Sequence, residues 1–313
     1  MTPEVARAAE LLRAGGLVAF PTETVYGLGA DASNAAAVAR LYAVKRRPPG
    51  HPVIVHFDSA ERAFAWAREV PEAACKLAAR FWPGPLTLIL KCSPLAKDFV
   101  TGGQDNVGVR VPSHPVAHEM LAAFGGGVAA PSANRFGLVS PTTAAHVRED
   151  LGNEVDLVLE GGPSEVGIES TILDLSGDVP TLLRPGHISK QELEQVIGRT
   201  IRDKGPIAPA HPGGLERHYA PRTLVKLVPP HALDAEIARL GVKVAVLAFS
   251  RPDERVDFWL RMPREPAGYA HKLYGALREL DTSDCDAILV EAPPDAPEWA
   301  AVRDRLRRAC GEA

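Results

Sequence analysis

The chain has 313 residues, of which 46% are hydrophobic and 24% are charged, and its formal net charge is −4. This length predicts two domains with cores that need neither disulfides nor metal ions, and the charge argues against a protein whose main task is to coat nucleic acid. The four cysteines lie far apart without metal-like spacing, and no apolar run approaches the roughly 20 residues of a membrane span. We therefore expect a cytoplasmic protein with no membrane span and no metal bound by the chain itself.

The first two hundred residues predict interleaved helices and strands. An amphipathic helix over residues 3–13 ends at Gly15 and Gly16 and leads into a strand over residues 17–20. Residues 21–31 are expected to be irregular. Several later strands are too close together for helical crossovers, so the expected sheet is mixed. The further expected helices are 34–45, 60–68, 72–80, 115–124, 142–149 and 190–197, and the further strands are 53–57, 86–90, 107–111, 128–130, 157–160, 171–175 and 181–184.

A segment rich in proline and glycine interrupts this pattern and is predicted to be a linker over residues 201–222. It divides the chain into a first domain, 1–200, and a second, 223–313. The second domain has no GxGxxG and no Walker-type motif, so no dinucleotide or Walker-type phosphate site is predicted there. Its expected strands at 224–228, 242–249 and 287–291 alternate with helices at 232–240, 266–280 and 297–309, which is typical of a small parallel α/β sheet.

Polar residues follow the first strand and the second helix. Thr22 and Thr24 lie in a loop with two glycines, which suits either a ligand at a strand end or a tight turn capped by the two hydroxyls. Lys45 and Arg47 lie at a helix end before a proline-rich loop with His51. These cations suit phosphate binding, or they simply complement the helix dipole. The segment Phe20 to Arg47 is thus a candidate site for an ATP-like polyanion.

Further candidates lie beyond residue 100. Ser132 and Asn134 follow a strand of small residues, which allows either a ligand close to the backbone or an N-cap with an Asx-turn. Arg110 and Arg184 are flanked by apolar strand residues, so each needs an anionic ligand or an internal ion pair. His56, within an apolar strand, is by default a core histidine.

Several motifs, in this order, closely resemble the threonylcarbamoyl-AMP synthase family. Over roughly residues 5–200 they are FPTETVYGLGA, the K-x-R of Lys45 and Arg47, WPGPLT, VGVRVPSHP, APSAN and GIESTI. The resemblance implies an α/β (α+β) catalytic domain with the YrdC-like fold, a mixed twisted sheet with helices. The segments 218–221, 273–281 and 305–309 resemble the linker and the Rossmann-like C-terminal domain of the family's long form. Residues 293–299 replace a glycine-rich turn of the family, so no role is carried over to them.

The resemblance implies a reaction in which L-threonine, bicarbonate or CO2, and ATP give L-threonylcarbamoyladenylate and pyrophosphate. This makes the expected enzyme a nucleotidyltransferase that uses Mg²⁺ on the phosphates and forms no covalent enzyme intermediate. The product would feed the separate tRNA threonylcarbamoyl transferase machinery, which forms threonylcarbamoyladenosine in tRNA. Because a carbamate is short-lived in water, Tyr219 on the linker is expected to be part of a lid.

The resemblance also implies the residues of two substrate sites. The positions that match the L-threonine site are Thr24, His56, Arg110, Ala130 and Ser170. The positions that match the ATP site are Arg47, His51, Asn106, Ser132, Ser140, Arg184 and Tyr219. The expected catalytic residues are Lys45, Arg47, Ser132 and Asn134.

Two other functions stay open from the sequence. The chain could be an RNA-binding module, since YrdC-like domains carry a concave basic surface, and weak RNA binding is compatible with the main prediction. It could also be a carbamoyl-transfer domain like the one in hydrogenase maturation proteins, although the acylphosphatase-like and zinc-finger segments of those proteins have no counterpart here.

Overall fold

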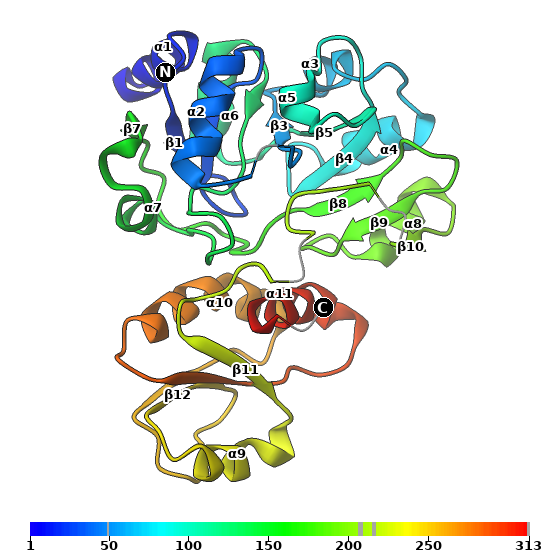
Figure 1. Cartoon of the computed structure of the whole chain (residues 1–313). Helices are drawn as coiled ribbons and strands as arrows, with labels where there is room; N and C mark the ends of the chain where they lie inside the picture. The colour runs from blue at the N-terminus through cyan, green and yellow to red at the C-terminus, as the bar shows by residue number, and fades with distance from the viewer. Residues whose placement is uncertain (49, 206–208, 215–216, 312–313) are drawn as a thin grey trace. The chain divides into compact units, whose positions relative to one another are not determined.

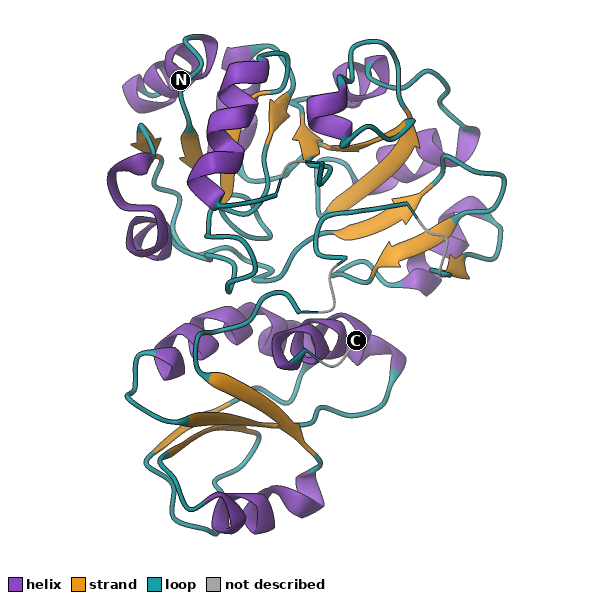
Figure 2. Ribbon diagram, in the orientation of Figure 1, coloured by secondary structure: helices purple, strands orange, loops and turns teal. Residues whose placement is uncertain are grey.

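The computed structural model describes residues 1–48, 50–205, 209–214 and 217–311 (Figures 1 and 2). These residues form two compact units. Unit 1 contains Met1–Phe136, Pro141–Glu165 and Glu169–Gly214, and unit 2 contains Gly137–Ser140, Val166–Ile168 and the described residues after 216. No helix in the described ranges is long and apolar enough to cross a membrane.

Unit 1 is built on a mixed sheet whose strands run in the order β10-β9-β8-β4-β5-β3-β6-β2-β1-β7. It contains parallel pairs such as β3–β5 and antiparallel pairs such as β4–β5, so the sheet is mixed, as predicted. Its strands are β1 Val18–Phe20, β2 Gly27–Asp31, β3 Ile54–His56, β4 Leu86–Lys91, β5 Asn106–Arg110, β6 Val128–Ala129, β7 Leu157–Val158, β8 Thr171–Asp174, β9 Thr181–Arg184 and β10 Arg202–Asp203. Its helices are α1 Pro3–Arg13, α2 Ala35–Lys45, α3 Ala60–Ala65, α4 Glu72–Phe81, α5 Asp98–Thr101, α6 Pro115–Phe124, α7 Ala144–Leu151, the 3-10 turn η1 Gly152–Glu154 and α8 Lys190–Ile197.

Both faces of β1 are buried, which explains its continuous run of apolar residues. Val18 and Phe20 pack with residues of α1 and α6, whereas Leu17 and Ala19 belong to the large core that includes residues of α2. Successive side chains of a strand point to opposite faces, so this short run supplies two cores at once. Unit 1 therefore has helices on both faces of this part of its sheet.

The central strands divide their side chains in the same way, but one face carries polar groups. Val107, Val109 and Val111 belong to the large core. Arg110 lies between Val109 and Val111 in sequence, so its side chain points to the opposite face. An apolar cluster of Ile54, Ile89, Ile172 and Leu183 lies on that opposite face. The sheet thus presents a buried polar patch at the ends of β3 and β5.

The expectation of an irregular segment over residues 21–31 was wrong at its end, because β2 occupies Gly27–Asp31. A glycine-rich segment has low β propensity, which is why the sequence did not indicate a strand. The packing requires Gly29. A Cβ on Gly29 would lie 2.9 Å from a methyl carbon of Val128 and 3.0 Å from the ring of Phe20. The short elements α5, β10 and β13 were also not predicted.

Unit 2 has a parallel sheet in the order β11-β14-β12-β13, which confirms the predicted small parallel α/β sheet. Its elements are β11 Leu224–Val228, η2 Pro230–Ala232, α9 Leu233–Leu240, β12 Val244–Ala248, β13 Phe258–Arg261, α10 Pro266–Asp281, β14 Ala287–Glu291, η3 Pro297–Trp299 and α11 Ala300–Cys310. The domain boundaries at residues 200 and 223 stay a prediction. The linker predicted between them includes residues 206–208 and 215–216, which lie outside the described residues.

Candidate active site

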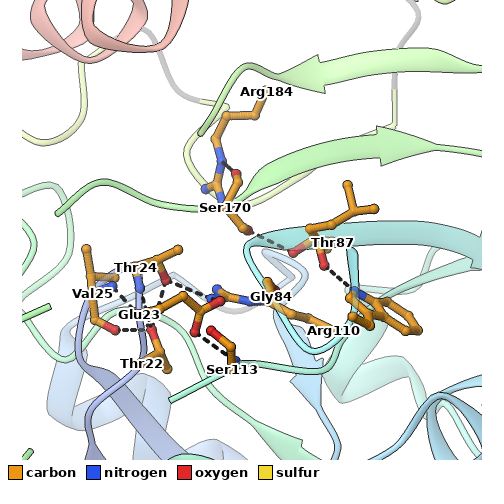
Figure 3. A network of polar contacts seen from close by, with 12 residues as sticks. Thr22, Glu23, Thr24, Val25, Gly84, Thr87, Arg110, Ser113, Ser170 and Arg184 are labelled. Atoms are coloured by element: carbon orange, nitrogen blue, oxygen red, sulfur yellow. Dashed lines mark hydrogen bonds and ion pairs between the residues drawn. The ribbon is translucent and has the colours of Figure 1, made fainter. Parts of the chain in front are cut away.

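Arg110, at the end of β5, forms a buried ion pair with Glu23 (Figure 3). Its Nη2 donates to Glu23 Oε1 at 2.6 Å and to Thr24 Oγ1 at 2.9 Å, and Glu23 Oε2 accepts from the Ser113 backbone N–H at 3.1 Å. The Arg110 and Glu23 side chains are only 5% and 4% exposed. The internal ion pair that the sequence left open for Arg110 is therefore present, and it makes this burial affordable because each charge compensates the other. Among the described residues, Nη1 of Arg110 has no hydrogen-bond partner.

Thr22 and Thr24 connect the loop after β1 to this ion pair. Thr22 Oγ1 donates to the Val25 carbonyl at 2.6 Å and accepts from the backbone N–H groups of Thr24 and Val25. It also lies 2.8 Å from Thr24 Oγ1. The tight turn that the sequence allowed is thus formed, and the same turn brings Thr24 against Arg110. The capped turn and a ligand site at the strand end are therefore compatible.

Ser170 directly precedes β8 and contacts Arg184, a residue that was predicted for the other substrate. Arg184 Nη2 donates to Ser170 Oγ at 3.1 Å, and Arg184 Nε donates to the Ser170 carbonyl at 3.0 Å. Thr87 Oγ1 in β4 lies 2.8 Å from Ser170 Oγ (Figure 3). The predicted threonine position Ser170 and the predicted ATP position Arg184 are therefore direct neighbours.

His56 ends β3 next to Arg110 in the register of the sheet. Burial, and secondarily the charge of Arg110, lower the pKa of His56 to about 3, so its imidazole is neutral at pH 7. The ring meets Phe20 edge-on, with 6.1 Å between centroids. Its Nδ1 is buried without a hydrogen-bond partner in the described ranges. Ala130 lies alongside and donates its backbone N–H to Ile54.

A second cluster surrounds Lys45 at the end of α2. Lys45 Nζ donates to the backbone carbonyls of Ser132 at 2.5 Å and Asn134 at 2.6 Å. Its ammonium therefore holds the S-x-N segment in place. Burial, and secondarily the charge of Arg47, lower the pKa of Lys45 well below its ordinary value. No carboxylate of the described residues forms an ion pair with it.

Arg47 is separated from Lys45 by Arg46, whose left-handed φ of 53° ends the helix. Arg47 Nη2 donates to the Pro52 carbonyl at 2.8 Å, and its guanidinium lies 5.7 Å from the ring centre of Tyr42 and 5.5 Å from that of Phe136. These contacts fix a planar cation in the loop. His51 lies near the same Phe136 ring, and burial together with Arg47 lowers the pKa of His51.

The remaining predicted residues are more dispersed. Asn106 begins β5 and pairs with Lys91, and Ser132 forms a β-bridge with Gly27. Asn134 Nδ2 donates to the Arg135 carbonyl. Ser140 and Tyr219 are buried in unit 2.

Tyr219 has the left-handed φ of 60°. Its ring stacks on Tyr274 with 5.9 Å between centroids, and the guanidinium of Arg305 lies 5.2 Å from its centre. The predicted lid role of Tyr219 stays a prediction.

Sequence reasoning missed two residues near the candidate site: Glu23, which pairs with Arg110, and Thr87, which contacts Ser170. Both lie inside motifs that the sequence analysis singled out, FPTETVYGLGA and WPGPLT. A buried arginine requires an anion, so the carboxylate between Thr22 and Thr24 was the signal for Glu23. No local signal identifies Thr87, because a threonine in a strand is ordinary.

Comparisons with known proteins cover nearly the whole chain. The telomere recombination family model, which groups Sua5, YciO and YrdC proteins, matches residues 10–186. The model of the threonylcarbamoyl-AMP synthase C-terminal domain matches residues 188–311. The threonylcarbamoyl-AMP synthase of Pyrococcus abyssi is 41% identical, over 97% of this chain and 93% of its own length. That of Bacillus subtilis is 40% identical, over 99% and 93%.

The structural match agrees. The crystal structure of P. abyssi Sua5 complexed with L-threonine matches with a TM-score of 0.91 and 40% identity, covering 98% of this chain and 94% of that one. These similarities confirm the resemblance seen in the motifs and do not support the hydrogenase-maturation alternative. The chain belongs to the threonylcarbamoyl-AMP synthase family.

Proposed function

We propose that this chain is a nucleotidyltransferase that makes L-threonylcarbamoyladenylate from L-threonine, bicarbonate or CO2, and ATP, with release of pyrophosphate. The observation that carries the proposal is the pair of neighbouring residues Ser170 and Arg184, hydrogen-bonded to each other at 3.1 Å. They match positions of the family's amino-acid site and ATP site. A reaction that joins an amino acid to a nucleotide needs its two substrates at adjoining positions, because the reacting atoms must come within about 3 to 3.5 Å.

The patch around Arg110 supports binding of L-threonine. Glu23 neutralises Arg110, yet Nη1 of Arg110 keeps its donors for a ligand oxygen, and this suits the carboxylate of a zwitterion. The neutral imidazole of His56 offers a buried nitrogen nearby. Thr24 and Ala130 complete the proposed amino-acid site, and the small side chain of Ala130 leaves room for the ligand.

The cluster around Lys45 supports binding of ATP. Arg47 and Arg184 supply planar forks for phosphate oxygens, and Lys45 fixes the backbone on which Ser132 and Asn134 lie. The remaining proposed ATP contacts come from His51, Asn106, Ser140 and Tyr219. The amine of threonine adds to CO2 and loses a proton, and a carbamate oxygen then attacks the α-phosphorus while pyrophosphate leaves. Positioning and charge neutralisation by these groups would carry the catalysis.

Mg²⁺ would supply further neutralisation of the phosphate charge. Within the described ranges, no group of three or more His, Cys, Asp or Glu residues could hold a metal ion. The proposed Mg²⁺ would instead arrive on the phosphates of ATP and keep several waters, as Mg²⁺ usually does. We propose further that the product is passed, in the cytoplasm, to a tRNA threonylcarbamoyl transferase.

The proposal is tested by pyrophosphate release from ATP and Mg²⁺ with the purified full chain. We expect release that requires both L-threonine and bicarbonate, and formation of threonylcarbamoyladenylate that mass spectrometry detects. Release that is independent of threonine in folded protein would contradict the proposal. Salt-sensitive RNA binding without any turnover would instead favour the RNA-binding alternative.

A further inference from the structure

Thr87, in β4, has a buried hydroxyl with one hydrogen-bond partner in the part of the chain that the structure describes. That partner is Ser170 Oγ, at 2.8 Å (Figure 3). The methyl group of Thr87 lies on the apolar side, where Ile54 and Ile89 also approach Gly108. Thr87 is therefore a polar group in a largely apolar setting, and its hydroxyl hydrogen needs an acceptor.

The direction of this hydrogen bond decides which hydroxyl hydrogen lacks an acceptor among the described residues. If Ser170 donates to Thr87, the Thr87 hydrogen has none, and if Thr87 donates to Ser170, the Ser170 hydrogen has none. A ligand at the proposed amino-acid site can accept from Ser170, whereas Thr87 lies in a largely apolar setting. Thr87 as the donor and Ser170 Oγ as the acceptor is therefore the direction in which a bound ligand satisfies both hydrogens.

Arg184 occupies the second acceptor position of the same oxygen. Its Nη2 lies 3.1 Å from Ser170 Oγ, and a guanidinium can only donate. A serine hydroxyl has two lone pairs and one hydrogen. With both lone pairs engaged, the hydroxyl hydrogen of Ser170 is left over, and no acceptor for it exists among the described residues.

We infer that Ser170 acts as a hydrogen-bond donor to an oxygen of the bound amino acid, and that Thr87 is the positioning residue that fixes this direction. The inference rests on the proposed function for the identity of the ligand. It adds a direction to the contact and a positioning role for Thr87, to which the resemblance assigned no role. Arg184 contributes to the same arrangement, so its contact with Ser170 would also couple binding of the nucleotide to the orientation of the serine hydroxyl.

Two variants separate this role from simple packing. Thr87→Val keeps the shape of the side chain and removes the hydroxyl, whereas Thr87→Ser keeps the hydroxyl and removes a methyl group. We expect Thr87→Val to raise the KM for L-threonine about tenfold, the effect of one hydrogen bond, with the KM for ATP changed less. Thr87→Ser should keep the KM for threonine near wild type although its thermal midpoint falls. If Thr87→Val leaves that KM unchanged, or if Thr87→Ser raises it equally, the inference is wrong.

A stability measurement tests the direction without turnover. L-threonine should raise the thermal midpoint of the wild type and of Thr87→Ser, and it should raise that of Thr87→Val less, because Ser170 is then no longer held as a donor to the ligand. A rise in Thr87→Val as large as that of the wild type would overturn the inference. Wild-type protein without threonine-dependent turnover would contradict the proposed function, while these midpoints would still decide the direction.

Discussion

Arg110 and Lys45 are both buried cations of unit 1, but they meet different partners. Arg110 meets the Glu23 carboxylate, so its patch is electrically balanced. Lys45 meets two backbone carbonyls, whose dipoles compensate its charge only in part. Burial consequently lowers the pKa of Lys45, and an anion nearby would raise it again. A balanced patch suits a zwitterion and an unbalanced one suits a polyanion, in agreement with the proposed threonine and ATP sites.

The largest effect on stability and activity is expected when one partner of the Arg110–Glu23 ion pair is removed. Arg110→Met leaves the Glu23 carboxylate buried and unpaired, which should lower the free energy of unfolding by about 3 to 5 kcal/mol. Threonine-dependent pyrophosphate release should fall to background. Urea denaturation and the release assay measure the two effects. The double variant Glu23→Gln with Arg110→Met should regain most of the stability but no activity, and an equally unstable double variant would contradict the assigned balance.

Arg47 tests whether the geometry of a cation matters in the second cluster. Arg47→Lys keeps the charge but loses the planar fork and its position between the rings of Tyr42 and Phe136. Turnover should fall roughly 10- to 100-fold, because phosphate contacts are lost when the reaction needs them. The matched control is Arg40→Lys in the preceding helix α2, where the Arg40 side chain is 43% exposed in a surface ion pair with Asp156. Equal turnover in the two variants would argue against a phosphate role for Arg47.

His56 should make folding sensitive to acid. Its folded-state pKa of about 3 lies below the ordinary value of 6.5, so the unfolded chain takes up the proton first as the pH falls. Stability from this residue is full above pH 6.5 and is lost toward pH 3, by about 3 kcal/mol at pH 4.5. In urea denaturation at pH 7 and pH 4.5, the free energy of unfolding of His56→Gln should fall less between the two pH values than that of the wild type. His231→Gln, at an exposed position, is the control and should lose as much stability as the wild type. An equally large loss in His56→Gln would contradict the prediction.

The smallest expected effect is a fraction of a proton taken up with ATP. Burial and Arg47 lower the pKa of Lys45 in the free protein, and a bound polyphosphate should raise that pKa, so protons are taken up between the two values. Calorimetry of ATP binding at pH 8 in buffers of different ionisation enthalpy measures the uptake. Lys45→Met should abolish it. Uptake of the same size in Lys45→Met would place the responsible group elsewhere.

Local patterns in the sequence predicted most elements of both units. The parallel sheet of unit 2 was predictable because its apolar strands alternate with helices along the chain, and parallel neighbours need such crossover connections. The strand β2 was not predicted, because its glycines serve close packing against Phe20 and Val128 rather than strand propensity. The sequence also identified Arg110 as a residue that needs an anion, but it could not decide between a ligand and Glu23, 87 positions away.

By itself, the sequence determined which residue types lie in which motifs. These motifs indicated the family, and they limited the partners of each cation to a ligand or an internal group. Tertiary structure alone decided the pairings, because a hydrogen bond or an ion pair depends on distances that sequence separation does not fix. Lys45 and Asn134 are 89 positions apart, and Thr87 and Ser170 are 83 apart. The tertiary fold brings each pair into contact, and it gathers separate motifs into two clusters, one electrically balanced and one not.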